Sequence, residues 1–374
     1  MRHSVPPPAL CFLACIGLLS PVACGPRADT TQASAPPCPT AAPDSANSAN
    51  SENSENSENS QASATLPRPV ALEVNADDGH HLRLWYLSRD TNDTNDTNNI
   101  KKNRRPAILL LHGRTWSSLP DFDLRVGDDP QLSLMHALAI RGYATYALDL
   151  RGYGESERNA SGWSEPLQAA EDVATALAMI REREGMSVDL LGWSYGAKVA
   201  QLTLQLHPDA ARKLVLYGYP HNTDATPKAG HAVGKARAPR PKKSTEAGAP
   251  PRKTNTAAAA RSDFITPGTI TEPAIQAFVD AALTADPTRA DWRHGDQFDA
   301  LDPTAISLPT LVIHGAGDPI ARLNWQTTLF RNLGAKNRQW VVLPGTDHAA
   351  HLEDPKAFLR ALLSFLDREN VERL

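Results

Sequence analysis

The chain has 374 residues and a formal net charge of −4, and 41% of its residues are hydrophobic, as in an ordinary soluble protein. All four cysteines lie before residue 39, so the rest of the chain forms no disulfide, no cysteine-ligated metal site and no cysteine nucleophile. The net charge alone says little about partners.

The first 24 residues are predicted to be an export signal. An apolar run over residues 9–19 follows a basic start, and it is too short to span a bilayer. The residues that follow this run, VACG at 22–25, resemble a bacterial lipobox in which Cys24 is lipidated, although Pro21 stands where leucine is usual. We expect a lipid anchor at Cys24, with simple cleavage or a retained anchor as alternatives. Each alternative places the body of the chain outside the cytoplasm, in the cell envelope of a bacterium.

Three segments have biased composition. Residues 25–66 contain almost no large apolar side chains and are expected to form a disordered tether. Residues 91–99 (TNDTNDTNN) read as an expanded loop. Residues 221–261 hold nine Lys or Arg against two acidic residues, a balance of +7. We expect this basic insertion to be a solvated disordered loop, and a contact with polyanions such as lipid headgroups is the alternative.

The body, residues 67–374, alternates strand-like and helical patterns. Eight apolar runs predict strands at 68–74, 81–87, 106–113, 143–150, 187–194, 213–219, 309–315 and 339–345. Helical periodicity, ended by Gly or Pro in three cases, occurs at 132–142, 169–185, 197–208 and 355–370. This alternation predicts an α/β fold with a doubly wound, mainly parallel eight-stranded sheet, whose first two strands form an antiparallel edge.

The stretch LLGWSYGAKVA, residues 190–200, places Ser194 between a buried strand and a helix. Its letters form a G-x-S-x-G motif, which arises by chance too easily to be decisive alone. Two features of such a turn favour a serine as a nucleophile. The turn lifts its hydroxyl above the sheet edge, and the helix N-terminus favours developing negative charge.

Five stretches together resemble the α/β-hydrolase fold over residues 67–374: LLLHGRTWSS, DLRGYGES, LLGWSYGAKVA, LVIHGAGDPI and LPGTDHAAHLEDP. The resemblance implies a catalytic triad in the chain order Ser194, Asp318, His348. In this reading His348 is the general base and Asp318 orients it. Asp347 and His351 lie beside the proposed base, and Asp224 is the reserve candidate for the acid.

The resemblance also implies an oxyanion hole made by the backbone N–H groups of Arg114 and Tyr195. The side chain of Arg114 is expected to face solvent, with contact to an anionic substrate as the alternative. His112 and the loop at 149–156 are expected to be structural. Residues of about 262–303 are expected to form a small helical cap over the pocket, with an amphipathic helix around 272–283.

No cofactor, metal or nucleic acid is expected, because the histidines lack metal-site spacing and no phosphate-binding glycine loop occurs. The sequence therefore predicts an exported serine hydrolase that cleaves a small ester or related acyl compound, which is its small-molecule partner. Perhydrolase or haloperoxidase-like chemistry and aminopeptidase activity on the same triad are alternatives. A non-catalytic envelope-binding protein that uses the basic insertion is the alternative from another class.

Overall fold

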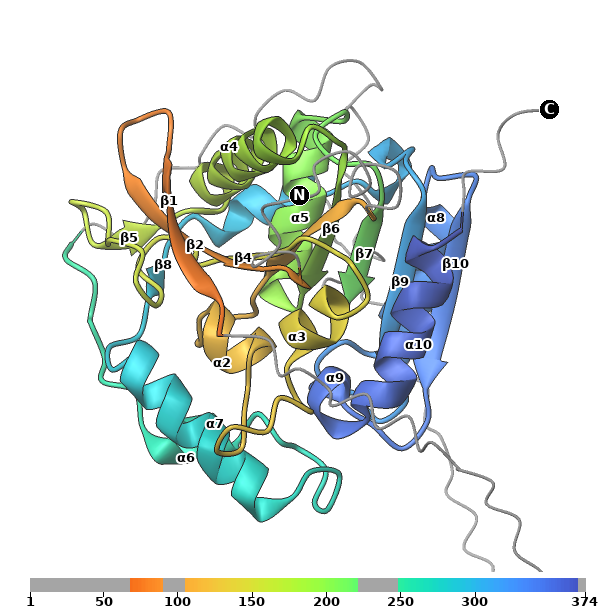
Figure 1. Ribbon diagram of the computed structural model, residues 1–374. Coiled ribbons are helices and arrows are strands. Elements are labelled where there is room, and N and C mark those ends of the chain that lie inside the picture. Colours follow the sequence, from red (N-terminus) through yellow and green to blue (C-terminus); the bar gives the residue numbers. More distant parts are fainter. Residues whose placement is uncertain (1–67, 90–104, 221–247, 369–374) are drawn as a thin grey trace, which may run out of the picture. The chain divides into compact units, whose positions relative to one another are not determined.

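The computed structural model describes residues 68–89, 105–220 and 248–368 (Figure 1). The predicted export signal, the tether, the 91–99 loop and most of the basic insertion lie outside the described residues. The lipid anchor at Cys24 therefore stays a prediction. Within the described residues, no helix has both the length and the apolar character needed to cross a membrane.

An eight-stranded sheet forms the centre of the described unit, and all eight strands correspond to the predicted runs. Their order in the sheet is β1-β2-β4-β3-β6-β7-β9-β10. The first strand pairs antiparallel with the second, the second pairs antiparallel with β4, and all other pairs are parallel. The strands are β1 Val70–Asn75, β2 His81–Leu87, β3 Ala107–Leu111, β4 Thr145–Leu148, β6 Val188–Trp193, β7 Leu214–Tyr217, β9 Thr310–Gly315 and β10 Arg338–Leu343.

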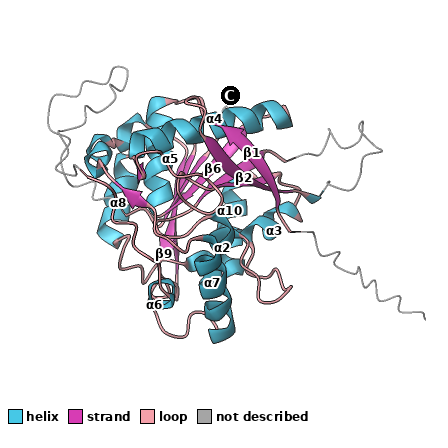
Figure 2. Cartoon of the chain, turned by 90° about the vertical axis from the view of Figure 1, so that its left-hand side faces the viewer, coloured by secondary structure: helices cyan, strands magenta, loops and turns pink. Residues whose placement is uncertain are grey.

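Helices cover both faces of the sheet (Figure 2). One face packs against α4 (Pro166–Glu184), α5 (Tyr195–Leu206) and α8 (Leu323–Asn332). The other packs against α3 (Leu134–Ala139) and α10 (Pro355–Leu366). Every residue of β3, β6, β7 and β9 is buried. Because both faces of these strands are covered, their sequences are continuous apolar runs rather than alternating ones.

The cap connects β7 to β9 and contains more structure than the single helix expected. The predicted amphipathic helix is α7 (Glu272–Ala285), and it begins and ends close to the expected bounds. Around it lie α6 (Ala257–Arg261), the strand β8 (Asp291–Trp292), and the 3₁₀ helices η2 (Gly295–Ala300) and η3 (Pro303–Ala305). The strand β8 pairs with β5 (Trp163–Ser164) in a second sheet that the sequence did not reveal.

The described end of the basic insertion, residues 248–261, corrects the expectation of a solvated loop. The hydroxyl of Thr256 accepts from the backbone N–H of Ala259 and caps α6, and Ala260 is fully buried. The side chain of Asn255 donates to the carbonyl of Asp286 at 2.8 Å. The four alanines of α6 are good helix formers with no side-chain entropy to lose, so this stretch packs on α7 despite its biased composition.

The cap docks on α2 (Ser118–Phe122), which follows β3 in the chain, and Figure 1 shows α7 beside α2. Trp116 and Phe278 meet edge to face, with ring centroids 6.3 Å apart, and both are buried. Burial of an aromatic side chain of this size contributes about 2–3 kcal/mol. The cap is thereby fixed to the same loop that approaches the turn at Ser194.

Candidate active site

The strand β6 ends at Trp193 and α5 begins at Tyr195, so Ser194 occupies the turn alone. Its backbone has φ 54° and ψ −115°, a conformation that costs free energy for a residue with a Cβ. Glycines make the turn possible on both sides. A Cβ at Gly192 would lie 2.4 Å from the carbonyl oxygen of Gly196, and a Cβ at Gly196 would lie 2.4 Å from that of His112. This strained turn presents the serine hydroxyl at the carboxyl edge of the parallel strands.

The three residues expected to act together are joined by hydrogen bonds. The hydroxyl of Ser194 donates to Nε2 of His348 at 2.8 Å. On the other ring nitrogen, Nδ1–H of His348 donates to Oδ2 of Asp318, also at 2.8 Å. Asp318 follows β9 and His348 follows β10, so neighbouring parallel strands deliver both to one edge of the sheet. Asp224, the reserve acid, lies outside the described residues.

Asp318 is held as a carboxylate. Burial by itself raises the pKa of this carboxyl, but the hydrogen bond and charge of His348 and two backbone N–H donors outweigh burial and lower the pKa. The N–H groups of Ile320 and Ala321 both donate to Oδ1 at 2.8 Å, and Oδ2 is left to face the imidazole. Hydrogen bonds from its own loop therefore fix the orientation of the Asp318 carboxylate, and the carboxylate in turn orients the imidazole of His348.

Two aromatic side chains fix the backbone of His348, and sequence reasoning did not find this role. The indole Nε1–H of Trp193 and the hydroxyl of Tyr217 each donate to the carbonyl of His348 at 2.9 Å. Trp193 and Tyr217 also stack on each other, with ring centroids 5.7 Å apart. The structure buries Trp193 beneath the site.

His351 and Asp347, the two residues beside the proposed base, have other hydrogen-bond partners. His351 is buried, and its Nε2–H donates to the carbonyl of Asp121 at 2.7 Å. Its Nδ1 lies 3.0 Å from the hydroxyl of Tyr217, and burial lowers its pKa to about 4. Oδ2 of Asp347 accepts from the backbone N–H of Thr266 at 2.6 Å. Within the described residues neither side chain forms a hydrogen bond with Ser194, and the partners of both hold the surrounding loops in place.

The residues expected to form the oxyanion hole lie beside the serine. Tyr195 follows Ser194 directly, and Arg114 follows Gly113, where a Cβ would lie 3.4 Å from Cβ of Ser194. In the described part of the chain, the backbone N–H of neither Arg114 nor Tyr195 has a hydrogen-bond acceptor. The Arg114 side chain is exposed, as expected. Both amides are thus available to an oxygen bound above Ser194.

The loops beneath the site have the structural roles expected of them. His112 donates from Nδ1 to the carbonyl of Gly113 at 2.8 Å and accepts at Nε2 from the N–H of Leu150 at 3.0 Å. The carboxylate of Asp149 accepts from the N–H groups of Ser118 and Glu155. These contacts tie the loop after β3 to the loop after β4.

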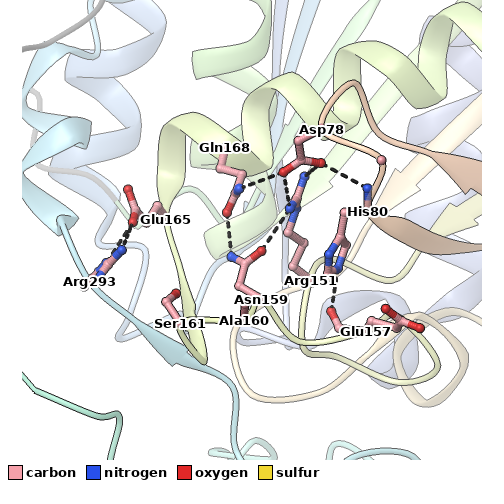
Figure 3. Close-up of a pocket in the computed structure, with 11 residues that line it drawn as sticks. Asp78, His80, Arg151, Glu157, Asn159, Ala160, Ser161, Glu165, Gln168 and Arg293 are labelled. Atoms are coloured by element: carbon pink, nitrogen blue, oxygen red, sulfur yellow. Dashed lines mark hydrogen bonds and ion pairs between the residues drawn. The ribbon is translucent and has the colours of Figure 1, made fainter.

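Arg151, in the loop after β4, has a similar structural role. It pairs with Asp172 at 2.7 Å. It also pairs with Asp78 at 2.8 Å and donates to Asn159 (Figure 3). Arg151, Asp78 and Asn159 line a polar cleft of about 430 Å³, and none of Ser194, His348 and Asp318 lines it. Because its charged groups are largely bonded to one another, the cleft is best explained as a structural ion-pair network.

Asp263 is a cap residue beside the site that sequence reasoning missed. One of its carboxylate oxygens accepts from the indole Nε1–H of Trp116 at 2.5 Å. Burial raises the pKa of Asp263 to about 6, against a smaller opposing effect of the Trp116 hydrogen bond and of the nearby His348. No motif marks this position, because the contact exists only once the cap has folded over the loop after β3.

Asp263→Asn is expected to stabilise the protein above about pH 6. The folded pKa of about 6 exceeds the ordinary value of 3.8, so the penalty is absent below pH 3.8, grows between about pH 3.8 and 6, and is complete above that range. At full size this shift corresponds to about 3 kcal/mol. Asparagine still accepts from Trp116 but adds an unpaired amide N–H, which leaves a gain of about 1–2 kcal/mol.

Urea unfolding at about pH 8 and about pH 4 measures this gain, which should be present at the first and absent at the second. Asp280→Asn, exposed on α7, is the matched control, with an expected change below about 0.5 kcal/mol. An Asp263 variant that is less stable than the wild type at the higher pH would contradict the assigned cost of burial.

The mainly parallel sheet with helices on both faces, and a serine hydrogen-bonded to a histidine that is itself bonded to an aspartate, define a hydrolase of the α/β-hydrolase superfamily. The family model described as serine aminopeptidase, S33, matches residues 103–355. This match spans more than half of the chain, and the chain belongs to that family.

Several known proteins are similar to this chain. A probable alcohol acetyltransferase of Cyberlindnera fabianii is 33% identical over 121 residues, which are 32% of this chain and 29% of that protein. The chain thus aligns with less than a third of this curated relative. The esterase RhEst1 from Rhodococcus sp. ECU1013 has a TM-score of 0.54 at 22% identity, over 80% of this chain and 99% of that one. The esterase EaEST from Exiguobacterium antarcticum has a TM-score of 0.51 at 19% identity, over 80% and 100%.

Proposed function

We propose that this protein is a serine hydrolase that cleaves a small ester or related acyl compound through an acyl-enzyme intermediate. The observation that carries the proposal is the continuous hydrogen-bonded chain from Ser194 through His348 to Asp318. An ordinary serine at a strand-to-helix turn needs neither partner. The strained backbone at Ser194 supports the same reading, because such strain is retained where the turn itself has a role.

Each group has one task in this mechanism. The hydroxyl oxygen of Ser194 attacks the substrate carbonyl while Nε2 of His348 takes its proton. His348 then passes the proton to the leaving alcohol, and Asp318 keeps Nδ1 protonated and the ring in place. The N–H groups of Arg114 and Tyr195 bind the oxyanion, and removal of one such donor costs about 3–4 kcal/mol of barrier in other hydrolases. Water, deprotonated by His348, then releases the acyl group.

Cleavage of a peptide N-terminus by the same triad is the second candidate, and the description of the matching family favours it. The chemistry up to the acyl-enzyme is shared, and only the leaving group changes from alcohol to amine. Perhydrolase or haloperoxidase-like chemistry would use the same serine and histidine. A comparison of 4-nitrophenyl esters with amino-acid 4-nitroanilides separates the first two candidates.

Labelling with a fluorophosphonate probe tests the proposal. We expect the purified fragment 67–374 to be labelled at Ser194, because only a serine activated by a base attacks the probe at a useful rate. Ser194→Ala and His348→Ala should stay unlabelled. A folded wild-type fragment that does not react would reject the hydrolase mechanism and favour a binding protein that acts through the basic insertion.

We also propose export and lipid anchoring at Cys24, which would hold the enzyme at a membrane of a bacterial cell envelope. The support is the sequence of residues 1–66 alone. Metabolic labelling with a fatty acid should mark the wild type and not Cys24→Ser, and equal labelling of both would reject the anchor.

A further inference from the structure

Two cationic side chains lie against the ring of Tyr195, the residue that follows the nucleophile. The guanidinium carbon of Arg114 is 5.9 Å from the ring centroid, and Nζ of Lys198 is 5.2 Å from it. The same Nζ lies 4.1 Å from the ring centroid of Phe298 in η2. Aromatic rings therefore hold both cations in place by cation–π contacts.

The backbone positions of both cations tie them to the nucleophile elbow. Lys198 comes three residues after Tyr195 in α5, so both side chains leave the same face of that helix. Arg114 follows Gly113, which packs directly on Ser194. One cation thus approaches from the β3 loop and the other from the helix behind the serine.

Neither cation has an ion-pair partner among the residues that the structure describes. Across the described residues, neither Arg114 nor Lys198 forms a salt bridge with a carboxylate, whereas Arg151 forms two. Burial and the charge of Arg114 lower the pKa of Lys198 to about 8, against a smaller opposing effect of the charge of Asp299. Two cations that lie against one ring, one of them partly buried, raise each other's free energy, and an anion bound beside that ring would relieve it.

Negatively and positively charged side chains lie on different sides of the site. The acidic side is Asp263, which interacts with His348 on the Trp116 side of the site. The cations gather around Tyr195, and the rings of Trp292 and Phe298 lie against that residue at 4.6 Å and 5.1 Å between centroids. A negative group on a substrate is repelled from the first side and attracted to the second, which orients the substrate over Ser194.

We propose that Arg114 and Lys198 form a subsite for a carboxylate carried by the substrate, so that the enzyme prefers acyl compounds with an anionic end. This inference rests on the proposed function, since it places the subsite beside the nucleophile. The aromatic rings of Tyr195 and Phe298 form the apolar side of the same subsite. They would contact the methylene groups between the carboxylate and the scissile carbonyl.

A pair of esters of equal acyl length, 4-nitrophenyl hydrogen adipate and 4-nitrophenyl hexanoate, tests the subsite. Binding is measured by calorimetry in the Ser194→Ala background, where no turnover occurs. We expect the adipate ester to bind about tenfold more tightly than the hexanoate ester, and this preference to shrink as salt is added. Lys198→Met should remove most of the preference, and Lys198→Arg should keep it. Lys356→Met, exposed on α10, is the control for net charge and should leave the ratio as it is.

Equal binding of the two esters in the Ser194→Ala background would overturn the subsite, and so would a preference that survives Lys198→Met. The ratio of kcat/KM for the two esters in the Ser194-intact protein provides the second readout. If that protein hydrolyses neither ester while the binding preference persists, the proposed function fails and the subsite stands. Loss of the preference with hydrolysis of both esters intact rejects the subsite alone.

Discussion

Asp318→Asn is expected to lower kcat for an ester by about 10⁴-fold while leaving the fold intact. In the wild type, Nδ1–H of His348 donates to the carboxylate, so Nε2 carries no proton and accepts from Ser194. An asparagine whose amide N–H faces the ring would donate to Nδ1 instead. The imidazole then holds its proton on Nε2, towards Ser194, and the base is lost.

Steady-state kinetics, together with urea unfolding, check this result. Asp347→Asn is the matched control, because Asp347 is also buried and precedes His348 but accepts from Thr266 rather than from the ring. We expect the control to retain activity within about tenfold of the wild type. If the control lost as much activity as Asp318→Asn, the assignment of the acid would be wrong.

The strands could be predicted from sequence because the sheet is covered on both faces. Continuous apolar runs such as Ala107–Leu111 and Val188–Trp193 are typical of the middle of a parallel sheet, where helices bury both faces of each strand. The same reasoning could not find β5 and β8, two residues each, whose pairing depends on where the cap lands. The same reasoning missed α6, because its alanines lie at the end of a long segment of biased composition that was expected to be a disordered loop.

The core of the candidate site was predictable because its members stand at the ends of strands. Ser194, Asp318 and His348 follow β6, β9 and β10, and parallel strands bring their carboxyl ends to one edge. The supporting residues are different. Tyr217 acts through a hydroxyl bonded to the carbonyl of His348, 131 positions away, and Asp263 reaches the site only through the folded cap. No local pattern encodes such contacts.

Gly196→Ala is expected to destabilise the protein by about 3 kcal/mol or more, a large part of the usual stability of a domain. Alanine favours an isolated helix over glycine by about 1 kcal/mol, so helix propensity alone predicts the opposite sign. The close approach of α5 to the end of β3 decides the outcome. A Cβ at this position would lie 2.4 Å from the carbonyl oxygen of His112 and 2.6 Å from that of Leu111.

Those two atoms are backbone, so they move only if the end of β3 moves with them. Such a shift would displace Gly113 and the amide of Arg114, and activity should fall together with the free energy of unfolding. Gly295→Ala is the control, since this glycine is exposed and a Cβ there meets nothing within 4 Å. Urea unfolding and labelling at Ser194 measure both effects. If Gly196→Ala were as stable as Gly295→Ala, the close packing of α5 on β3 would not be needed to hold the nucleophile elbow.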